Sequence, residues 1–179
     1  MTPLTKTHKH VIGYYGAIAD WFDTELLEYL ATKLPDCQFV LIGHTFGSDI
    51  RKLSQFSNVE FLGERPYSEL PKYLHLFDVC IIPFKLSPLI KATHPVKIYE
   101  YFSSGKPVVS TYLPELIPMA DLCYLATDHE DFLKKLNIAL NENNPDVIKK
   151  RINFASENTW QHRFKVIYDE IQKFEDMAN

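Results

Sequence analysis

Apolar runs alternate with amphipathic segments along the whole chain. Short runs that are apolar at nearly every position occur at residues 11–16, 37–43, 58–63, 79–84, 107–111 and 123–127. Such runs are typical of strands that are buried on both faces of a sheet. The segments between and after them have helical spacing of apolar residues and predict helices at 21–34, 48–56, 68–77, from about 95, 129–141, 145–155 and 157–175.

Strands that alternate with helices indicate a parallel sheet with right-handed crossovers. We therefore predict the α/β class: a doubly wound, Rossmann-like sheet of about six strands with helices on both faces. Residues 10–179 form one domain in this interpretation, and the polar residues 1–9 form a leader or linker.

Composition narrows the function classes. The chain has 179 residues, is 46% apolar and carries a net charge of −4, which gives no electrostatic reason to expect nucleic-acid binding. No apolar run reaches the roughly 18 residues of a membrane span, and the opening MTPLTKTHKH lacks the apolar core of a signal peptide. We expect a cytoplasmic protein whose three cysteines, Cys37, Cys80 and Cys123, are buried reduced thiols.

A ligand of such a sheet is expected beyond the carboxyl ends of the strands, where the strand order reverses. In the common order 3-2-1-4-5-6 this point lies between the first and fourth strands. The loop after the first strand opens with Gly16 and Ala17, which either admit a ligand to the backbone or form an ordinary tight turn. The chain contains neither a dinucleotide-binding fingerprint nor a Walker-type loop.

The stretch THPVKIYEYFSSGKPVVS, residues 93–110, follows a long loop after the fourth strand. Pro95 predicts the first turn of a helix, with Thr93 or His94 as its cap. Lys97 then faces the positive end of the helix dipole, which is unfavourable unless an anion binds there. Lys97 and Glu100, at i and i+3, form either a solvated surface pair or a site for a diphosphate and a ribose diol.

At these residues the chain resembles a known family. The segments GERPYSELPKYLHLFDVCIIPF and HPVKIYEYFSSGKPVVS resemble the C-terminal domain of GT-B glycosyltransferases of the group 1, or family 4, type. The opening IGYYGAIADWFD is similar to bacterial polysaccharide-synthesis members, and Trp160 resembles the tryptophan that opens the family's terminal helix. The matching central positions are Gly63, Asp78, Pro95, Lys97, Glu100, Tyr101, Gly105, Lys106, Pro107, Val108 and Val109.

The resemblance implies the donor-binding half of a retaining glycosyltransferase, which takes a sugar from a UDP- or GDP-sugar and uses no metal or further cofactor. It assigns no catalytic residue to this half. Carried over by position, the binding residues are Gly16 and Ala17 at the phosphates or donor sugar, Glu64 and Arg65 at the base, Thr93, His94 and Lys97 at the diphosphate, and Glu100 at the ribose.

The chain also departs from the family pattern. Ala92 stands where many members have a first glutamate, and AIADWFD lacks the basic pair that usually holds the pyrophosphate. Phosphate binding would then depend on Lys97, Lys91 or Lys85 and on backbone amides. An alternative is a non-catalytic Rossmann-like interaction module that has lost donor binding.

A complete enzyme of this type has a second, N-terminal half that binds the acceptor, a glycan or a lipid-linked sugar, and the full-length enzyme can associate peripherally with the inner face of the membrane. We expect this chain alone to bind nucleotide weakly and to transfer no sugar. Its terminal helix carries an apolar stripe typical of core packing. The resemblance implies that this helix crosses towards the partner half, which would leave part of the stripe exposed and favour self-association. The stripe consists of Trp160, Phe164, Ile167, Ile171 and Phe174.

Other polar residues carry weaker alternatives. His94 could serve as an acid or base, although a cap or a phosphate contact is the better interpretation. His8 and His10 could bind a metal, and the aspartates Asp20, Asp23 and Asp78 could suggest a receiver domain. A receiver domain needs an aspartate at the end of the third strand, where this chain has Gly63.

Overall fold

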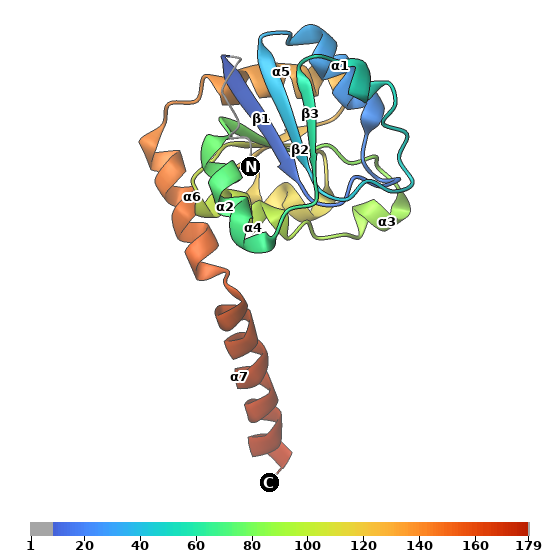
Figure 1. The fold of residues 1–179 in the computed structure, drawn as a ribbon. Helices are drawn as coiled ribbons and strands as arrows, with labels where there is room; N and C mark the ends of the chain where they lie inside the picture. Colours follow the sequence, from blue (N-terminus) through green and yellow to red (C-terminus); the bar gives the residue numbers. More distant parts are fainter. Residues whose placement is uncertain (1–8, 179) are drawn as a thin grey trace.

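A six-stranded, entirely parallel sheet forms the centre of the structure, a computed structural model that describes residues 9–178 (Figure 1). The strand order is β3-β2-β1-β4-β5-β6, so both the predicted fold class and the predicted reversal between the first and fourth strands are confirmed. The strands are β1 (His10–Tyr15), β2 (Cys37–Ile42), β3 (Val59–Gly63), β4 (Val79–Ile82), β5 (Val108–Thr111) and β6 (Tyr124–Ala126).

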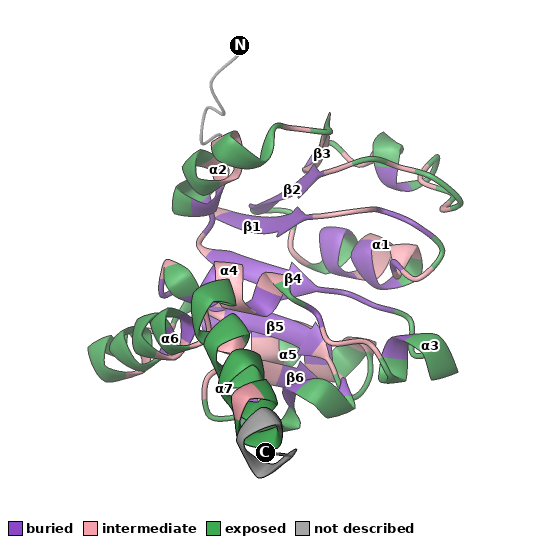
Figure 2. Cartoon of the chain, turned by 90° about the horizontal axis from the view of Figure 1, so that it is seen from below, coloured by how far each residue is buried: buried purple, intermediate pink, exposed green. Residues whose placement is uncertain are grey.

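The helices cover both faces of this sheet, which explains why the strand sequences are apolar at nearly every position (Figure 2). Helices α2 and α4 pack on one face, with α6 against α4, and α1 and α5 pack on the other. The α-helices are α1 (Thr24–Lys33), α2 (Leu70–Leu76), α3 (Pro88–Lys91), α4 (Lys97–Ser103), α5 (His129–Leu140), α6 (Pro145–Glu157) and α7 (Trp160–Ala178), and the 3-10 turns are η1 (Leu53–Gln55), η2 (Tyr67–Glu69) and η3 (Pro114–Met119).

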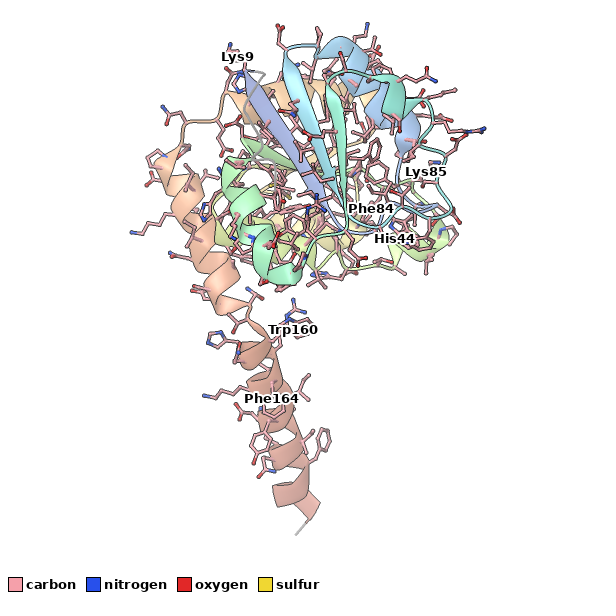
Figure 3. All side chains as sticks on the ribbon, in the orientation of Figure 1. Lys9, His44, Phe84, Lys85, Trp160 and Phe164 are labelled. Carbon is pink, nitrogen blue, oxygen red and sulfur yellow. The ribbon has the colours of Figure 1, made fainter. Side chains whose placement is uncertain are left out.

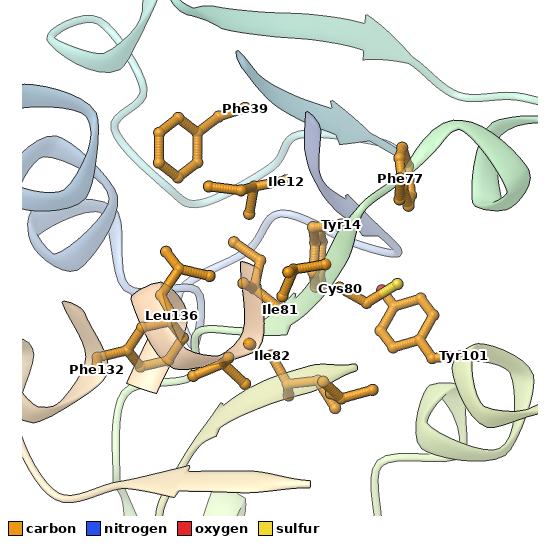
Figure 4. Close-up of a cluster of buried hydrophobic side chains, with 14 of the residues drawn as sticks. Ile12, Tyr14, Phe39, Phe77, Cys80, Ile81, Ile82, Tyr101, Phe132 and Leu136 are labelled. Atoms are coloured by element: carbon orange, nitrogen blue, oxygen red, sulfur yellow. The ribbon is translucent and has the colours of Figure 1, made fainter. Parts of the chain in front are cut away.

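The core lies between the sheet and these helices. Ile12 and Phe39 contribute from β1 and β2, and Tyr101 and Phe132 contribute from α4 and α5 on opposite faces (Figure 4). All three cysteines are free and buried, so that prediction is confirmed. No helix in residues 9–178 is long and apolar enough to cross a membrane.

The predicted helix at 48–56 is wrong, since only the 3-10 turn Leu53–Gln55 forms there. Gly47 has a φ of +74°, and the Ser48 hydroxyl donates a hydrogen bond to the carbonyl of Ala19 instead of capping a helix. Asp49 accepts hydrogen bonds from the backbone and guanidinium of Arg51. These local bonds compete with helical ones.

Several boundaries also differ from the prediction. Helix α1 begins at Thr24 because the Asp23 carboxylate accepts the amide of Leu26 at 2.9 Å and so caps the helix. The helix predicted at 68–77 begins later, at Leu70, because Ser68 lies inside the 3-10 turn η2, which leads directly into α2. The long loop at 85–95 contains the short helix α3, which is capped by Ser87.

Helix α7 points away from the domain, and its apolar stripe is not packed in the core (Figure 1). Trp160, Phe164, Ile167, Ile171 and Phe174 are between 50% and 71% exposed, and the first two extend from α7 beyond the domain in Figure 3. Core packing was therefore the wrong expectation, and the exposed stripe that the resemblance implied is present. The leader expected at residues 1–9, including His8, lies outside the described residues apart from Lys9.

Candidate functional site

A cavity of about 400 Å³ opens at the carboxyl ends of β1, β2 and β3, beside the start of α4. Loops that are far apart in sequence form its wall because parallel strands end at the same edge of a sheet. His44 lies at this end of the sheet, as does Phe84 (Figure 3). The lining residues are Tyr15, Gly16, Ala17, Ile42, Gly43, His44, Glu64, Arg65, Tyr67, Leu70, Val96, Lys97 and Glu100.

Lys97 is the first residue of α4, and its side chain lies against the inner wall of this cavity. Its Nζ is 4.9 Å from the ring centroid of Phe84 and 5.2 Å from that of Tyr14. Burial lowers the pKa of Lys97 to about 8, although the nearby negative charge of Glu100 acts in the opposite direction. The lysine is partly buried, and burial disfavours its charge. No ion pair joins Lys97 to Glu100 in residues 9–178, so the alternative of a surface pair between them is wrong.

The loop after β1 needs its glycine because Lys97 passes directly over it. Gly16 has a φ of +136°, and a Cβ at this position would lie 3.1 Å from Cε and 3.2 Å from Nζ of Lys97. Gly43 has a φ of +147°, and a Cβ there would lie 1.9 Å from the carbonyl oxygen of Gly16. The two glycines therefore let the ends of β1 and β2 and the lysine come together.

Glu100 lies one turn further along α4, where its carboxylate accepts a hydrogen bond from Tyr67 and its charge acts on the nearby Tyr15. The hydroxyl of Tyr67 is 2.9 Å from Oε1, and this bond is the main cause of the raised pKa of Tyr67. Burial, followed by the charge of Glu100 and a hydrogen bond with it, raises the pKa of Tyr15. Sequence reasoning missed both tyrosines. The only signal for Tyr15 was its place before Gly16, and for Tyr67 its place after Pro66.

Glu64 and Arg65 lie on the opposite side of the cavity, in the loop after β3. Arg65 is held by two hydrogen bonds: Nε donates to the hydroxyl of Tyr73 at 3.2 Å, and a guanidinium nitrogen donates to the carbonyl of Glu64 at 3.0 Å. Arg65 and Lys97 supply the positive charges of the cavity lining. Both are positioned to meet an anion.

Thr93 and His94 are not brought into the cavity. The Thr93 hydroxyl donates to the carbonyl of Leu89 at 2.8 Å, and the His94 ring lies 2.9 Å from the Tyr99 hydroxyl and 3.3 Å from the Glu115 carboxylate. The prediction that one of them caps the helix is wrong, because Val96 occupies the cap position and makes no side-chain cap bond. Their predicted contact with a diphosphate stays a prediction.

The other lysines considered for the phosphates lie elsewhere. Lys85 and Lys91 are exposed and do not line the cavity, and Lys85 borders a separate hollow together with Asp20. The His10 ring lies 3.8 Å from the carboxylate of Asp78. Residues 9–178 contain no group of three or more histidine, cysteine, aspartate or glutamate side chains that could hold a metal ion.

A second cavity, of about 560 Å³, lies at the other side of the sheet, near the starts of α1 and α5. Its charged lining consists of Asp23, Asp128, Glu130 and the partly exposed His129, whose ring is 3.3 Å from the Asp23 carboxylate. Three carboxylates without a lysine or arginine do not suit a phosphate group. The cavity at Lys97 is therefore the candidate site for an anionic ligand, although it is smaller.

Solved structures with the same architecture define the class of the fold. Anabaena HepE in complex with UDP and glucose matches 98% of this chain with a TM-score of 0.67 and 18% identity, over 50% of its own chain. Sucrose-phosphate synthase from Thermosynechococcus elongatus matches 96% with a TM-score of 0.71 and 15% identity, over 47% of its chain. The fold is that of one Rossmann-like domain of a GT-B glycosyltransferase.

Sequence comparison identifies the family. The profile of the family described as glycosyl transferases group 1 matches residues 9–142. A protein named as a teichuronic acid biosynthesis glycosyltransferase, TuaH of Bacillus subtilis (strain 168), is 32% identical over 173 residues that cover 91% of this chain. The chain belongs to the group 1 glycosyltransferases and corresponds to their C-terminal domain. It spans 44% of the length of TuaH.

Proposed function

We propose that this chain binds the nucleotide-sugar donor of a group 1 glycosyltransferase in the cavity at Lys97. One observation carries the proposal: α4 directs a partly buried cation and, one turn later, a carboxylate into the same cavity, which lies beside the point where the strand order reverses. A partly buried cation without a carboxylate within ion-pair distance suits a phosphate. No ion pair joins Lys97 to another part of the described chain.

The arrangement of the lining suggests how the donor lies. The diphosphate would meet the ammonium of Lys97, while Gly16 and Ala17 allow close approach of the backbone. The ribose would then reach Glu100, since an ionised carboxylate accepts two hydrogen bonds from a vicinal diol. The base would lie towards Glu64 and Arg65. We propose a UDP- or GDP-sugar as the donor, with no metal or other cofactor.

Transfer of the sugar needs a second half of the enzyme in this proposal. The bond between the anomeric carbon and the diphosphate oxygen breaks, and the diphosphate leaves with the electron pair and the negative charge that Lys97 neutralises. The acceptor hydroxyl oxygen bonds to the anomeric carbon and gives its proton to the leaving diphosphate or to water. We propose that an N-terminal half binds the acceptor, a glycan or a lipid-linked sugar, and that transfer retains the anomeric configuration. This chain alone would bind donor without transferring sugar.

The setting follows from the same comparison. The name of TuaH refers to teichuronic acid biosynthesis, and we propose that this chain likewise serves the synthesis of a bacterial polysaccharide. The full-length enzyme would act in the cytoplasm, with peripheral association at the inner face of the membrane.

Calorimetric titration with UDP, GDP and ADP tests donor binding. We expect one of these nucleotides to bind, Glu100→Ala to weaken its binding at least tenfold through loss of the ribose contact, and Lys97→Gln to weaken it further. Glu157→Ala and Lys150→Gln on the exposed face of α6 are the matched controls and should bind like the unaltered chain.

The same titration separates the proposal from the alternative of an interaction module. The absence of any basic residue in AIADWFD favours that alternative. If no nucleotide binds, even after an N-terminal half has been restored by fusion, the donor-binding proposal is wrong.

A further inference from the structure

Tyr67 stands between the candidate site and a second, smaller cavity. The candidate site has a volume of about 400 Å³, and the neighbouring cavity between α2 and α4 has about 230 Å³. Tyr67, Tyr15, Leu70 and Glu100 line both. The hydrogen bond from Tyr67 to Glu100 therefore spans the boundary between the two spaces, on the path that a ligand would take from one to the other.

The two tyrosines near Glu100, Tyr15 and Tyr67, differ in how tightly they are held. Tyr15 is 5% exposed, and its ring packs edge to face against Tyr101 at a centroid distance of 4.9 Å. Tyr67 is 73% exposed, and its hydroxyl makes a 2.9 Å hydrogen bond to Glu100. Glu100 thus lies beside one tyrosine that is fixed in the core, and it accepts a hydrogen bond from another that can move into solvent at little cost in packing.

The position that Tyr67 occupies on Glu100 is the one that a sugar hydroxyl would need. An ionised carboxylate accepts hydrogen bonds but donates none, so a phenol and a sugar hydroxyl are equivalent partners for the same oxygen. A ligand hydroxyl can replace the phenol and still satisfy the same carboxylate oxygen. The ring of Tyr67, once released, remains anchored at η2, within reach of whatever fills the cavity.

We propose that Tyr67 is an exchangeable part of the donor site: its hydroxyl holds Glu100 in the empty site, a ribose hydroxyl displaces it, and its ring then packs against the nucleobase. This inference rests on the proposed function. It assigns Tyr67 two opposing effects, since the hydroxyl competes with the ligand and the ring contributes to ligand binding.

Two variants of Tyr67 separate these effects. Tyr67→Phe removes the competing hydroxyl and keeps the ring, so the nucleotide that the unaltered chain binds should bind equally well or a few-fold more tightly. Tyr67→Ala removes the ring as well, and we expect binding to weaken about tenfold, as is typical when an aromatic ring that stacks on a base is lost. Tyr112→Phe and Tyr112→Ala, at a 42% exposed tyrosine after β5 that does not line either cavity, are the controls.

A spectroscopic measurement follows the ring directly. With ¹³C-labelled tyrosine, the resonance that disappears in Tyr67→Phe identifies Tyr67, and saturating nucleotide should shift it upfield because the ring stacks on the base. The Tyr112 resonance should not move.

Each outcome has a clear meaning. If the unaltered chain binds no nucleotide, the proposed function fails and this inference fails with it. If nucleotide binds and Glu100→Ala weakens it, but Tyr67→Phe weakens binding as much as Tyr67→Ala, or neither variant changes binding and the resonance stays in place, only the inference about Tyr67 is overturned.

Discussion

Replacing Lys97 by methionine should make the folded domain more stable at neutral pH. Methionine fills a similar space against the rings of Tyr14 and Phe84 but carries no charge into the cavity wall. A residue that is kept despite an unfavourable environment in the empty protein points to a ligand that relieves the cost. The perturbation therefore tests the physical basis of the site without any nucleotide.

The magnitude follows from the pKa. Burial lowers the pKa of Lys97 from 10.5 to about 8, and at about 1.4 kcal/mol for each pKa unit the charged form in the folded state costs about 3.5 kcal/mol. Methionine also loses the attraction to the two aromatic rings, about 1 kcal/mol at a partly exposed site. We expect Lys97→Met to raise the free energy of unfolding by about 2–2.5 kcal/mol at pH 7.

The pH dependence has a definite sign. Below about pH 8 Lys97 is protonated in both the folded and the unfolded chain, so the full free-energy cost of its buried charge lowers the stability of the folded protein. Between pH 8 and 10.5 the unfolded chain binds a proton that the folded chain does not, and stability from this group rises with pH. The advantage of Lys97→Met should therefore be largest at pH 7 and should shrink towards pH 10.

Urea unfolding followed by circular dichroism at pH 7 and pH 9.5 measures both quantities. Lys150→Met on the exposed face of α6 is the control, and we expect it to change stability by less than about 0.5 kcal/mol. A Lys97→Met variant that is less stable than the unaltered chain at pH 7, or whose advantage is equal at the two pH values, would refute the reasoning.

Two further predictions concern other parts of the molecule. Arg151, 1% exposed, is paired with the buried carboxylate of Glu142, and Arg151→Ala should lower the free energy of unfolding by about 3–5 kcal/mol because it leaves that carboxylate buried and unpaired. Urea unfolding measures the loss, and Arg51→Ala, at an exposed ion pair, is the control. A loss no larger than that of the control would contradict the prediction. The exposed stripe of α7 should make the chain self-associate, so light scattering of the unaltered chain should give a mass above that of the monomer. The double variant Phe164→Glu with Ile167→Glu should have the mass of the monomer and an unchanged circular dichroism spectrum. An unaltered chain that stays monomeric at high concentration would contradict this.

Local patterns were sufficient for most of the fold. The six apolar runs became the six strands, because a strand that is covered on both faces of a sheet is apolar at most of its positions. The segment 48–56 was less predictable. Its apolar spacing favours a helix, but Ser48 bonds to the carbonyl of Ala19 and Asp49 bonds to Arg51, and only a 3-10 turn forms. The bond of Ser48 depends on where Ala19 lies, which is a property of the folded chain.

The candidate site was only partly accessible from sequence. Lys97 and Glu100 are three residues apart on one helix, so their common direction could be inferred from spacing. Thr93 and His94 were expected beside them and lie elsewhere, since Val96 rather than either of them precedes the first helical residue. Tyr67 lies 33 residues from Glu100 in the chain, and no pattern within either segment indicates that they meet.

The sequence by itself determined the order of strands and helices, the family, and the pair of charges on α4, because each depends on residues that are neighbours in the chain. Only the tertiary structure decided that Lys97 is partly buried, that Tyr67 binds Glu100, and that the stripe of α7 is uncovered. Those properties depend on which distant surfaces come together, since burial and hydrogen bonding are set by the space around a side chain and not by its neighbours in sequence. The lysine at the start of α4 looks like an ordinary surface residue in the sequence, and the fold places it in an apolar wall where only an anion would favour its charge.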